Sequence, residues 1–145
     1  MVSLQPQIRQ GFSLVELVIY IAIVAVLAMV AIPAGFKYMK DARISSAKSK
    51  IRAFEGAITM FQVQMGQYPS QLKDLVEQPS DERLKRKWTG EFLEKKPDMF
   101  VDPWSNKYQY KLTPQDAEHK YELYSYGPNG KGSPKSEWIS VWELE

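Results

Sequence analysis

One carboxylate, Glu16, stands alone in a long apolar segment near the start of the chain. Residues 10–36 make up 27 positions, and Glu16 is the one charged side chain among them. Carrying a carboxylate to the centre of a bilayer costs about 2.5–3.5 kcal/mol on insertion scales, so a group kept there is usually functional and has a partner. Glu16 is therefore the first candidate functional residue.

The other residue types offer little for catalysis. The 145-residue chain has no cysteine, which excludes disulfide frameworks, cysteine-ligated zinc and thiol nucleophiles. Its one histidine, His119, leaves no multi-histidine metal site and makes a Ser-His-Asp triad a poor candidate. A balance of 19 basic against 17 acidic residues argues against a dedicated nucleic-acid binder. We expect no enzyme, because the chain shows no convergent acid, base and nucleophile.

The element that carries Glu16 has the length of a membrane span. From residue 12 to residue 33, 19 of 22 side chains are apolar. As a helix, this segment is roughly 33 Å long, which is enough for a bilayer core of about 30 Å. Backbone groups in lipid must bond to one another, so a helix is the expected form. Pro33 should bend the helix or end it.

Three interpretations of this segment compete. A secretory signal peptide needs a shorter apolar core, of about 7–15 residues, and has no place for a carboxylate at its head. A plain N-terminal anchor fits the length but leaves Glu16 unexplained. The third interpretation gives Glu16 a role, and we prefer it for that reason.

The residues around Glu16 resemble a known signal. Residues 11–16 read G-F-S-L-V-E and precede the apolar run. This pattern is similar to the class III signal of type IV pilins and type II secretion pseudopilins. The resemblance implies cleavage after Gly11 by a prepilin peptidase and N-methylation of the new amino terminus, Phe12. It also makes Glu16 the fifth residue of the mature chain, a position used in assembly, and Pro33 the position at which family members also carry proline.

The resemblance further implies partners and a topology. In a helical fibre of identical subunits, the Glu16 carboxylate can meet the Phe12 ammonium of a neighbour, so that neither charge stays unpaired in apolar surroundings. Minor pseudopilins and an inner-membrane assembly platform would be further partners. The N-terminus would be cytoplasmic and the C-terminal part periplasmic. A count of flanking charges alone, Arg9 against Lys37, Lys40 and Arg43, gives the opposite orientation, but a cleavage site must face the peptidase.

Helical spacing continues beyond Pro33. Apolar residues step by three and four over three heptads, at Ile44, Ala47, Ile51, Phe54, Ile58, Phe61 and Met65. We expect one helix over 12–65, with Gly66 as its C-terminal stop. The apolar stripe could be a coiled-coil seam, but we favour a face that packs on the chain's own sheet.

The composition changes near residue 67, where a head domain is expected to begin. Alternating segments at 108–113, 121–126 and 138–143 predict a three-stranded antiparallel sheet. Ser70 is expected to cap a short helix over 71–77. Residues 79–101 read as a loop, His119 as a solvated loop residue, and Trp104 as a core anchor.

Two head segments also resemble major pseudopilins of type II secretion. Residues 102–110 read D-P-W-S-N-K-Y-Q-Y, with Ser105 where that family usually has glycine. The loop over 125–137 resembles a calcium loop that lacks most of its acids: Asn129 stands where aspartate is usual, and Glu137 is the one carboxylate. Calcium takes six to eight oxygens, usually with several carboxylates. We therefore expect no metal cofactor here, and calcium is the disfavoured alternative.

These inferences predict an α+β, pilin-like fold in which a long N-terminal helix, half transmembrane and half amphipathic, packs on a small three-stranded antiparallel sheet. The expected parts are a cleaved leader (1–11), a transmembrane and fibre-core helix (12–33), an amphipathic stalk (34–66) and a periplasmic head (67–145). The expected function is that of a structural pseudopilus subunit that helps to drive folded proteins across the outer membrane. The alternative is a type IV pilin or minor pilin used in adhesion, motility or DNA uptake.

Overall fold

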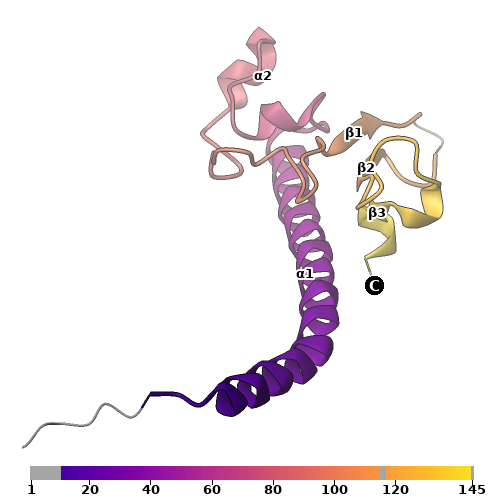
Figure 1. Ribbon diagram of the computed structural model, residues 1–145. Helices are drawn as coiled ribbons and strands as arrows, with labels where there is room; N and C mark the ends of the chain where they lie inside the picture. The colour runs from indigo at the N-terminus through magenta and orange to yellow at the C-terminus, as the bar shows by residue number, and fades with distance from the viewer. Residues whose placement is uncertain (1–10, 115–116, 145) are drawn as a thin grey trace, which may run out of the picture. The chain divides into compact units, whose positions relative to one another are not determined.

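The computed structural model describes residues 11–114 and 117–144. The leader expected over 1–11 therefore lies outside the described residues except for Gly11. The chain divides into two compact units, Met1–Lys40 and Asp41–Glu145. Figure 1 labels the helices and strands, from the long helix α1 (Leu14–Met65) to three short strands near the C-terminus. A 3₁₀ turn (Lys135–Glu137) precedes the third strand, and another follows it.

Helix α1 confirms the long helix expected from the sequence. It runs from Leu14 to Met65, includes Pro33 in its interior, and stops at Gly66. Gly66 has a φ of +76°, a left-handed conformation that glycine adopts at little cost. Its amide donates to the carbonyl of Gln62 at 2.9 Å, which closes the last turn. The bend expected at Pro33 stays a prediction, because a proline inside a helix removes one backbone bond without fixing an angle.

The apolar stripe of α1 packs on the chain's own head, as we favoured over a coiled-coil seam. Its residues from 47 to 65 are buried in one cluster with residues of the sheet and the loops, and Ile44 is half-buried against that cluster. Phe54 contacts the Tyr108 ring edge-on at 5.4 Å, and Phe61 contacts Phe92 at 5.1 Å. Each such aromatic pair adds about 0.5–1.5 kcal/mol beyond the area that it buries.

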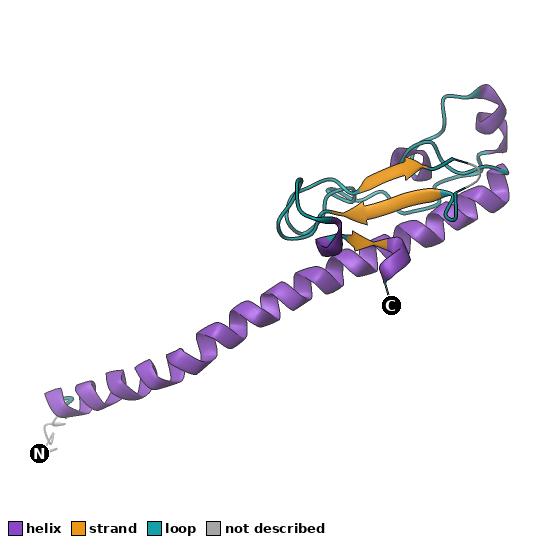
Figure 2. Ribbon diagram, turned by 90° about the vertical axis from the view of Figure 1, so that its right-hand side faces the viewer, coloured by secondary structure: helices purple, strands orange, loops and turns teal. Residues whose placement is uncertain are grey.

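The sheet has the three antiparallel strands that were expected, in the order β1 (Gln109–Leu112), β2 (Tyr121–Ser125), β3 (Ile139–Ser140). In Figure 2 it lies along the second half of α1. Alternation along β2 buries Tyr121, Leu123 and Ser125 and exposes or half-exposes the residues between them. The third strand is shorter than predicted, because the chain turns into a 3₁₀ helix (Val141–Glu143) that the Ser140 hydroxyl caps at 3.4 Å from the Trp142 amide.

Two local predictions were wrong. The segment 79–101, read as a loop, contains helix α2 (Glu82–Lys87), because the Asp81 carboxylate caps its start by accepting from the amides of Arg83 and Leu84 at 2.8 and 3.2 Å. The expected helix over 71–77 is a shorter 3₁₀ helix (Leu72–Leu75). Its start is held by the Asp74 carboxylate, which accepts from the Ser70 amide at 2.9 Å, and not by the Ser70 hydroxyl.

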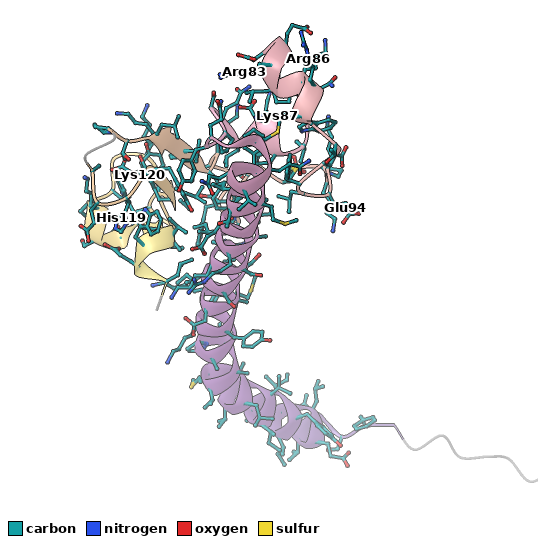
Figure 3. All side chains as sticks on the ribbon, turned by 180° about the vertical axis from the view of Figure 1, so that it is seen from behind. Arg83, Arg86, Lys87, Glu94, His119 and Lys120 are labelled. Atoms are coloured by element: carbon teal, nitrogen blue, oxygen red, sulfur yellow. The ribbon has the colours of Figure 1, made fainter. Side chains whose placement is uncertain are left out.

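His119 is not the solvated loop residue that we expected. It is half-buried, and its ring stacks on Trp142 at 4.0 Å with 5° between the planes. Figure 3 shows His119 and Lys120 together beside the C-terminal turns, while Arg83, Arg86 and Lys87 stand on α2. Trp104 is partly buried against the core, as expected for an anchor.

A buried carboxylate organises the turn that precedes β1. Asp102 is 5% exposed, and its side chain accepts from the amides of Trp104 and Asn106 at 3.0 and 2.9 Å and from the Ser125 hydroxyl at 2.5 Å. These bonds provide the partners that a buried charge needs. Ser105 has a φ of +69° within this turn. That left-handed conformation explains why glycine suits this position.

Candidate assembly site

The residues at the expected cleavage point are accessible. Gly11, Phe12 and Ser13 precede α1, lie outside any regular element and are exposed. A Cβ atom added to Gly11 would meet nothing within 4 Å. The fold of this chain therefore does not require glycine at position 11.

Glu16 lies in the first turn of α1 and closes its start. One of its carboxylate oxygens accepts from the Ser13 amide at 3.1 Å, and the Leu17 amide donates to the Ser13 carbonyl at 3.1 Å. This is the glutamate half of a capping box, in which the third helical residue bonds back to the capping residue. The carboxylate also lies at the positive end of the helix dipole. The S-x-x-E spacing over 13–16 could have predicted this bond, but our reading of the sequence missed it.

The side chains that follow Glu16 form an uninterrupted apolar surface. Large apolar residues from Leu14 to Ile32 are all more than half exposed. Among the described residues, α1 is the one helix long and apolar enough to cross a membrane: its best 18-residue window has a mean hydropathy of 2.8 and is not buried by the rest of the chain. So much exposed apolar surface is costly in water and requires either lipid or other subunits to cover it.

The structure brings together three of the four sequence-predicted site residues. Gly11, Phe12 and Glu16 lie within the first helical turn and the three residues before it, and the Phe12 ring contacts Tyr20 edge-on at 6.0 Å. Pro33 belongs to the same helix but lies about five turns further along it. The candidate site is thus a helix start that combines the expected cleavage point, the residue expected to become the amino terminus, and a carboxylate.

The other candidate, the loop between β2 and β3, offers few metal ligands. Glu137 is its one carboxylate, and that carboxylate accepts from the Asn129 amide nitrogen at 2.6 Å. Across residues 11–114 and 117–144, no group of three or more histidine, cysteine, aspartate or glutamate side chains could hold a metal ion. The donor set therefore does not fit calcium.

Comparison with known proteins decides the family. The family model described as "Type II secretion system (T2SS), protein G" matches residues 35–142. The chain belongs to the type II secretion system protein G family. A second model, for the prokaryotic N-terminal methylation motif, matches residues 7–32, which include the candidate cleavage point and Glu16.

Relatives within the protein G family match the chain over most of its length. The type II secretion system core protein G of Pseudomonas aeruginosa is 32% identical over 97% of this chain and 99% of the relative. The protein of the same name from Xanthomonas campestris is 34% identical over 85% of this chain and 81% of the relative. A crystal structure of the major pseudopilin of enterohaemorrhagic Escherichia coli has a TM-score of 0.57 and 22% identity, and the match covers 74% of this chain and 92% of that one. It confirms the long helix and three-stranded sheet of the protein G fold.

Proposed function

We propose that this chain is the structural subunit of a type II secretion pseudopilus, assembled at the inner membrane into a periplasmic fibre that helps to drive folded proteins across the outer membrane. The observation that carries the proposal is the start of α1, where an exposed Gly11–Phe12 bond is followed in sequence by the Glu16 carboxylate, at the head of an exposed apolar helix. The names of the relatives favour a secretion system over the alternative of a type IV pilin or minor pilin.

Cleavage changes the electrostatics of the first turn. While the leader is attached, the Phe12 nitrogen is a neutral amide; after cleavage it becomes an ammonium, which N-methylation leaves charged. The cleaved helix then carries one cation and one anion, the Phe12 ammonium and the Glu16 carboxylate, at the edge of a hydrocarbon surface. In a fibre, the carboxylate of one subunit pairs with the ammonium of the next, so that both charges are satisfied away from water.

The exposed apolar surface serves the proposed function in two successive environments. In the inner membrane, lipid covers residues 12–33, with the N-terminus in the cytoplasm and the head in the periplasm. In the fibre, the same side chains of neighbouring subunits cover one another. The prepilin peptidase, the minor pseudopilins and the inner-membrane assembly platform are the partners that this route requires. No step requires catalysis by this chain.

Substitution of Glu16 tests the proposal. Glu16→Gln keeps the capping bond to the Ser13 amide, because glutamine serves in a capping box, but removes the charge. Glu16→Val removes both. We expect both variants to be cleaved, methylated and held in the membrane, and neither to form fibres. The measurements are the mass of the N-terminal peptide, the membrane fraction and the fibres sheared from cells that express the assembly system.

The matched control is Glu91→Val, which removes an exposed carboxylate from a head loop and should leave fibre formation unchanged. If Glu16→Gln forms fibres at wild-type levels, the proposed pairing of the Glu16 carboxylate with an ammonium is wrong, and Glu16 contributes to assembly only through the helix cap. If both Glu16 variants form normal fibres, this assembly mechanism is wrong.

A further inference from the structure

The loop that joins β2 to β3 is held closed by direct contacts at several points. Gly127 has a φ of +74°, and a Cβ atom added to it would lie 2.8 Å from the carbonyl oxygen of Glu137. The two ends of the loop therefore touch. Two successive turns fold the segment between the loop's ends. The Gly130 amide donates to the Gly127 carbonyl, and the Ser133 amide donates to the Gly130 carbonyl, both at 3.2 Å.

Trp138 holds one side of this loop. Its indole stacks on Tyr124 at 4.3 Å with 7° between the planes, and meets the edge of Tyr126 at 5.3 Å. The indole Nε1 donates to the Ser133 carbonyl at 3.0 Å, so the ring is tied to the middle of the loop as well as to β2. The Lys135 ammonium lies 5.8 Å from the centre of the Trp138 ring, within the range of a cation–π contact.

The polar side of the loop is closed by two hydrogen bonds. The Asn129 side-chain nitrogen donates to the Glu137 carboxylate at 2.6 Å, across eight residues of sequence. The Ser133 hydroxyl adds a second link by donating to the Tyr126 carbonyl at 3.0 Å. Bonds to a charged acceptor are the stronger kind of hydrogen bond, although exposure to water weakens this one.

These contacts occupy the place where the resemblance in sequence implies calcium. A calcium ion would need several carboxylates and six to eight oxygens. Here the single carboxylate of Glu137 already accepts from an N–H group, and the loop carries two ammonium groups, on Lys131 and Lys135, that would repel a divalent cation. An asparagine amide that donates its N–H to the carboxylate shows a loop arranged for direct bonding between side chains.

We propose that this loop is a metal-independent staple, in which Trp138 and the Asn129–Glu137 bond do the work of a bound cation. The head then keeps its fold at any calcium concentration. Assembly of the chain, by whatever route, then does not depend on calcium binding. The proposal concerns the stability of the head and stands whether or not the chain forms a pseudopilus.

The first test is thermal unfolding of the full chain in detergent, once with excess calcium and once with EDTA. Near-ultraviolet circular dichroism monitors the unfolding. We expect the same Tm in both. A ligand that binds only the folded state at saturating concentration raises Tm by several degrees in a domain of this size. A rise of that size in calcium overturns the proposal.

The second test separates a hydrogen bond from a metal ligand. Glu137→Gln keeps an acceptor oxygen for Asn129, so its Tm should stay close to that of the wild type, whereas Glu137→Ala should lower it. Asn129→Asp should lower Tm in EDTA, because two carboxylates then face each other. Ser80→Asp adds the same charge to an exposed position elsewhere and should leave Tm unchanged.

The proposal is wrong if Glu137→Ala and Asn129→Asp both unfold at the wild-type temperature in EDTA. The Asn129–Glu137 bond would then contribute nothing to the stability of the head. The proposal is also wrong if the Tm of Glu137→Gln falls as far as that of Glu137→Ala and calcium raises the Tm of the wild type alone. Trp138→Phe keeps a stacked ring but loses the bond to the Ser133 carbonyl. It should unfold a few degrees lower, equally with and without calcium.

Discussion

At the scale of single residues, Glu16 meets two requirements with one carboxylate. In the single chain it accepts from the Ser13 amide and so satisfies a donor that the helix start leaves open. In the proposed fibre it neutralises an ammonium of the next subunit. A residue that serves both the start of a helix and the contact between helices couples the position of α1 in one subunit to the position of α1 in its neighbour.

Gly11 is the residue at which processing can be separated from folding. Because a Cβ atom at this position meets nothing, Gly11→Val should leave the structure unchanged while the prepilin peptidase fails to remove the leader. Mass spectrometry of the chain after co-expression with the peptidase measures the outcome. Gly35→Ala, at another glycine with open space around it, is the control and should be cleaved normally. Complete cleavage of Gly11→Val would place the cleavage point elsewhere.

Ser105 is a strained residue that glycine should relieve. A left-handed conformation costs a residue with a Cβ atom about 1–2 kcal/mol, and a new glycine adds about 0.4–1 kcal/mol of chain entropy to the unfolded state. Ser105→Gly should therefore stabilise the head by about 0.5–1 kcal/mol, measured as a rise in Tm of the chain in detergent. Ser70→Gly, at an exposed serine without a positive φ, should not raise Tm. A lower Tm for Ser105→Gly would mean that its hydroxyl stabilises the turn.

At the scale of elements, strand β2 packs through aromatic rings against segments that are distant in the sequence. Tyr121 of β2 contacts Tyr68 at 5.6 Å, Tyr110 at 5.7 Å and Trp142 at 5.1 Å. Burial raises the pKa of Tyr121 to about 12, with a smaller contribution from Glu55. Burial also raises the pKa of Tyr108, and Asp102 adds to that effect. The packed rings must stay neutral for the sheet to hold.

Alkaline pH should therefore unfold the head. In the unfolded chain a tyrosine ionises near pH 10, whereas folded Tyr121 ionises near 12. Between these values the unfolded state binds fewer protons than the folded state, so the free energy of unfolding falls as the pH rises. We expect a flat Tm from pH 7 to 9 and a steady fall above about 10. Melting curves of the chain in detergent across this range provide the measurement.

Tyr121→Phe keeps the ring and should make the alkaline fall in Tm less steep. Tyr38→Phe, at an exposed tyrosine of the first unit, should leave it unchanged. An alkaline Tm profile of Tyr121→Phe that is identical to that of the wild type would show that Tyr121 titrates at the same pH in the folded and unfolded chains.

At the scale of the whole molecule, the chain combines two units with opposite relations to water. Within the described part of the chain, the unit Met1–Lys40 has no core of its own and exposes nearly all of its apolar side chains, while the unit Asp41–Glu145 buries a core of eighteen residues. The average composition, 44% hydrophobic and 25% charged, conceals this division. A subunit of this kind is soluble at one end only, so its first unit requires lipid or other copies of itself.

Features that depend on neighbouring residues could be predicted from the sequence. The apolar segment 12–33, the helical stripe and the alternation in β2 are local patterns whose period fixes the type of element. Helix α2 was missed although its signal, an aspartate before E-R-L-K-R-K, was there to be found. The third strand was predicted too long, because alternation continues into residues that the Ser140 cap turns into a 3₁₀ helix.

The sequence by itself determined which segment is apolar, where the helix stops, which strands form and which residues carry the processing signal, because each of these depends on residue types at short spacing. Only the tertiary structure decided which polar groups meet across the fold. Lys50 donates to the carbonyls of Asp98 and Val101, and Arg52 donates to that of Leu144. The bonds from Ser125 to Asp102 and from Asn129 to Glu137 are further cases. A pattern of types cannot specify such pairs, because each forms only after packing has brought distant backbone segments within about 3 Å.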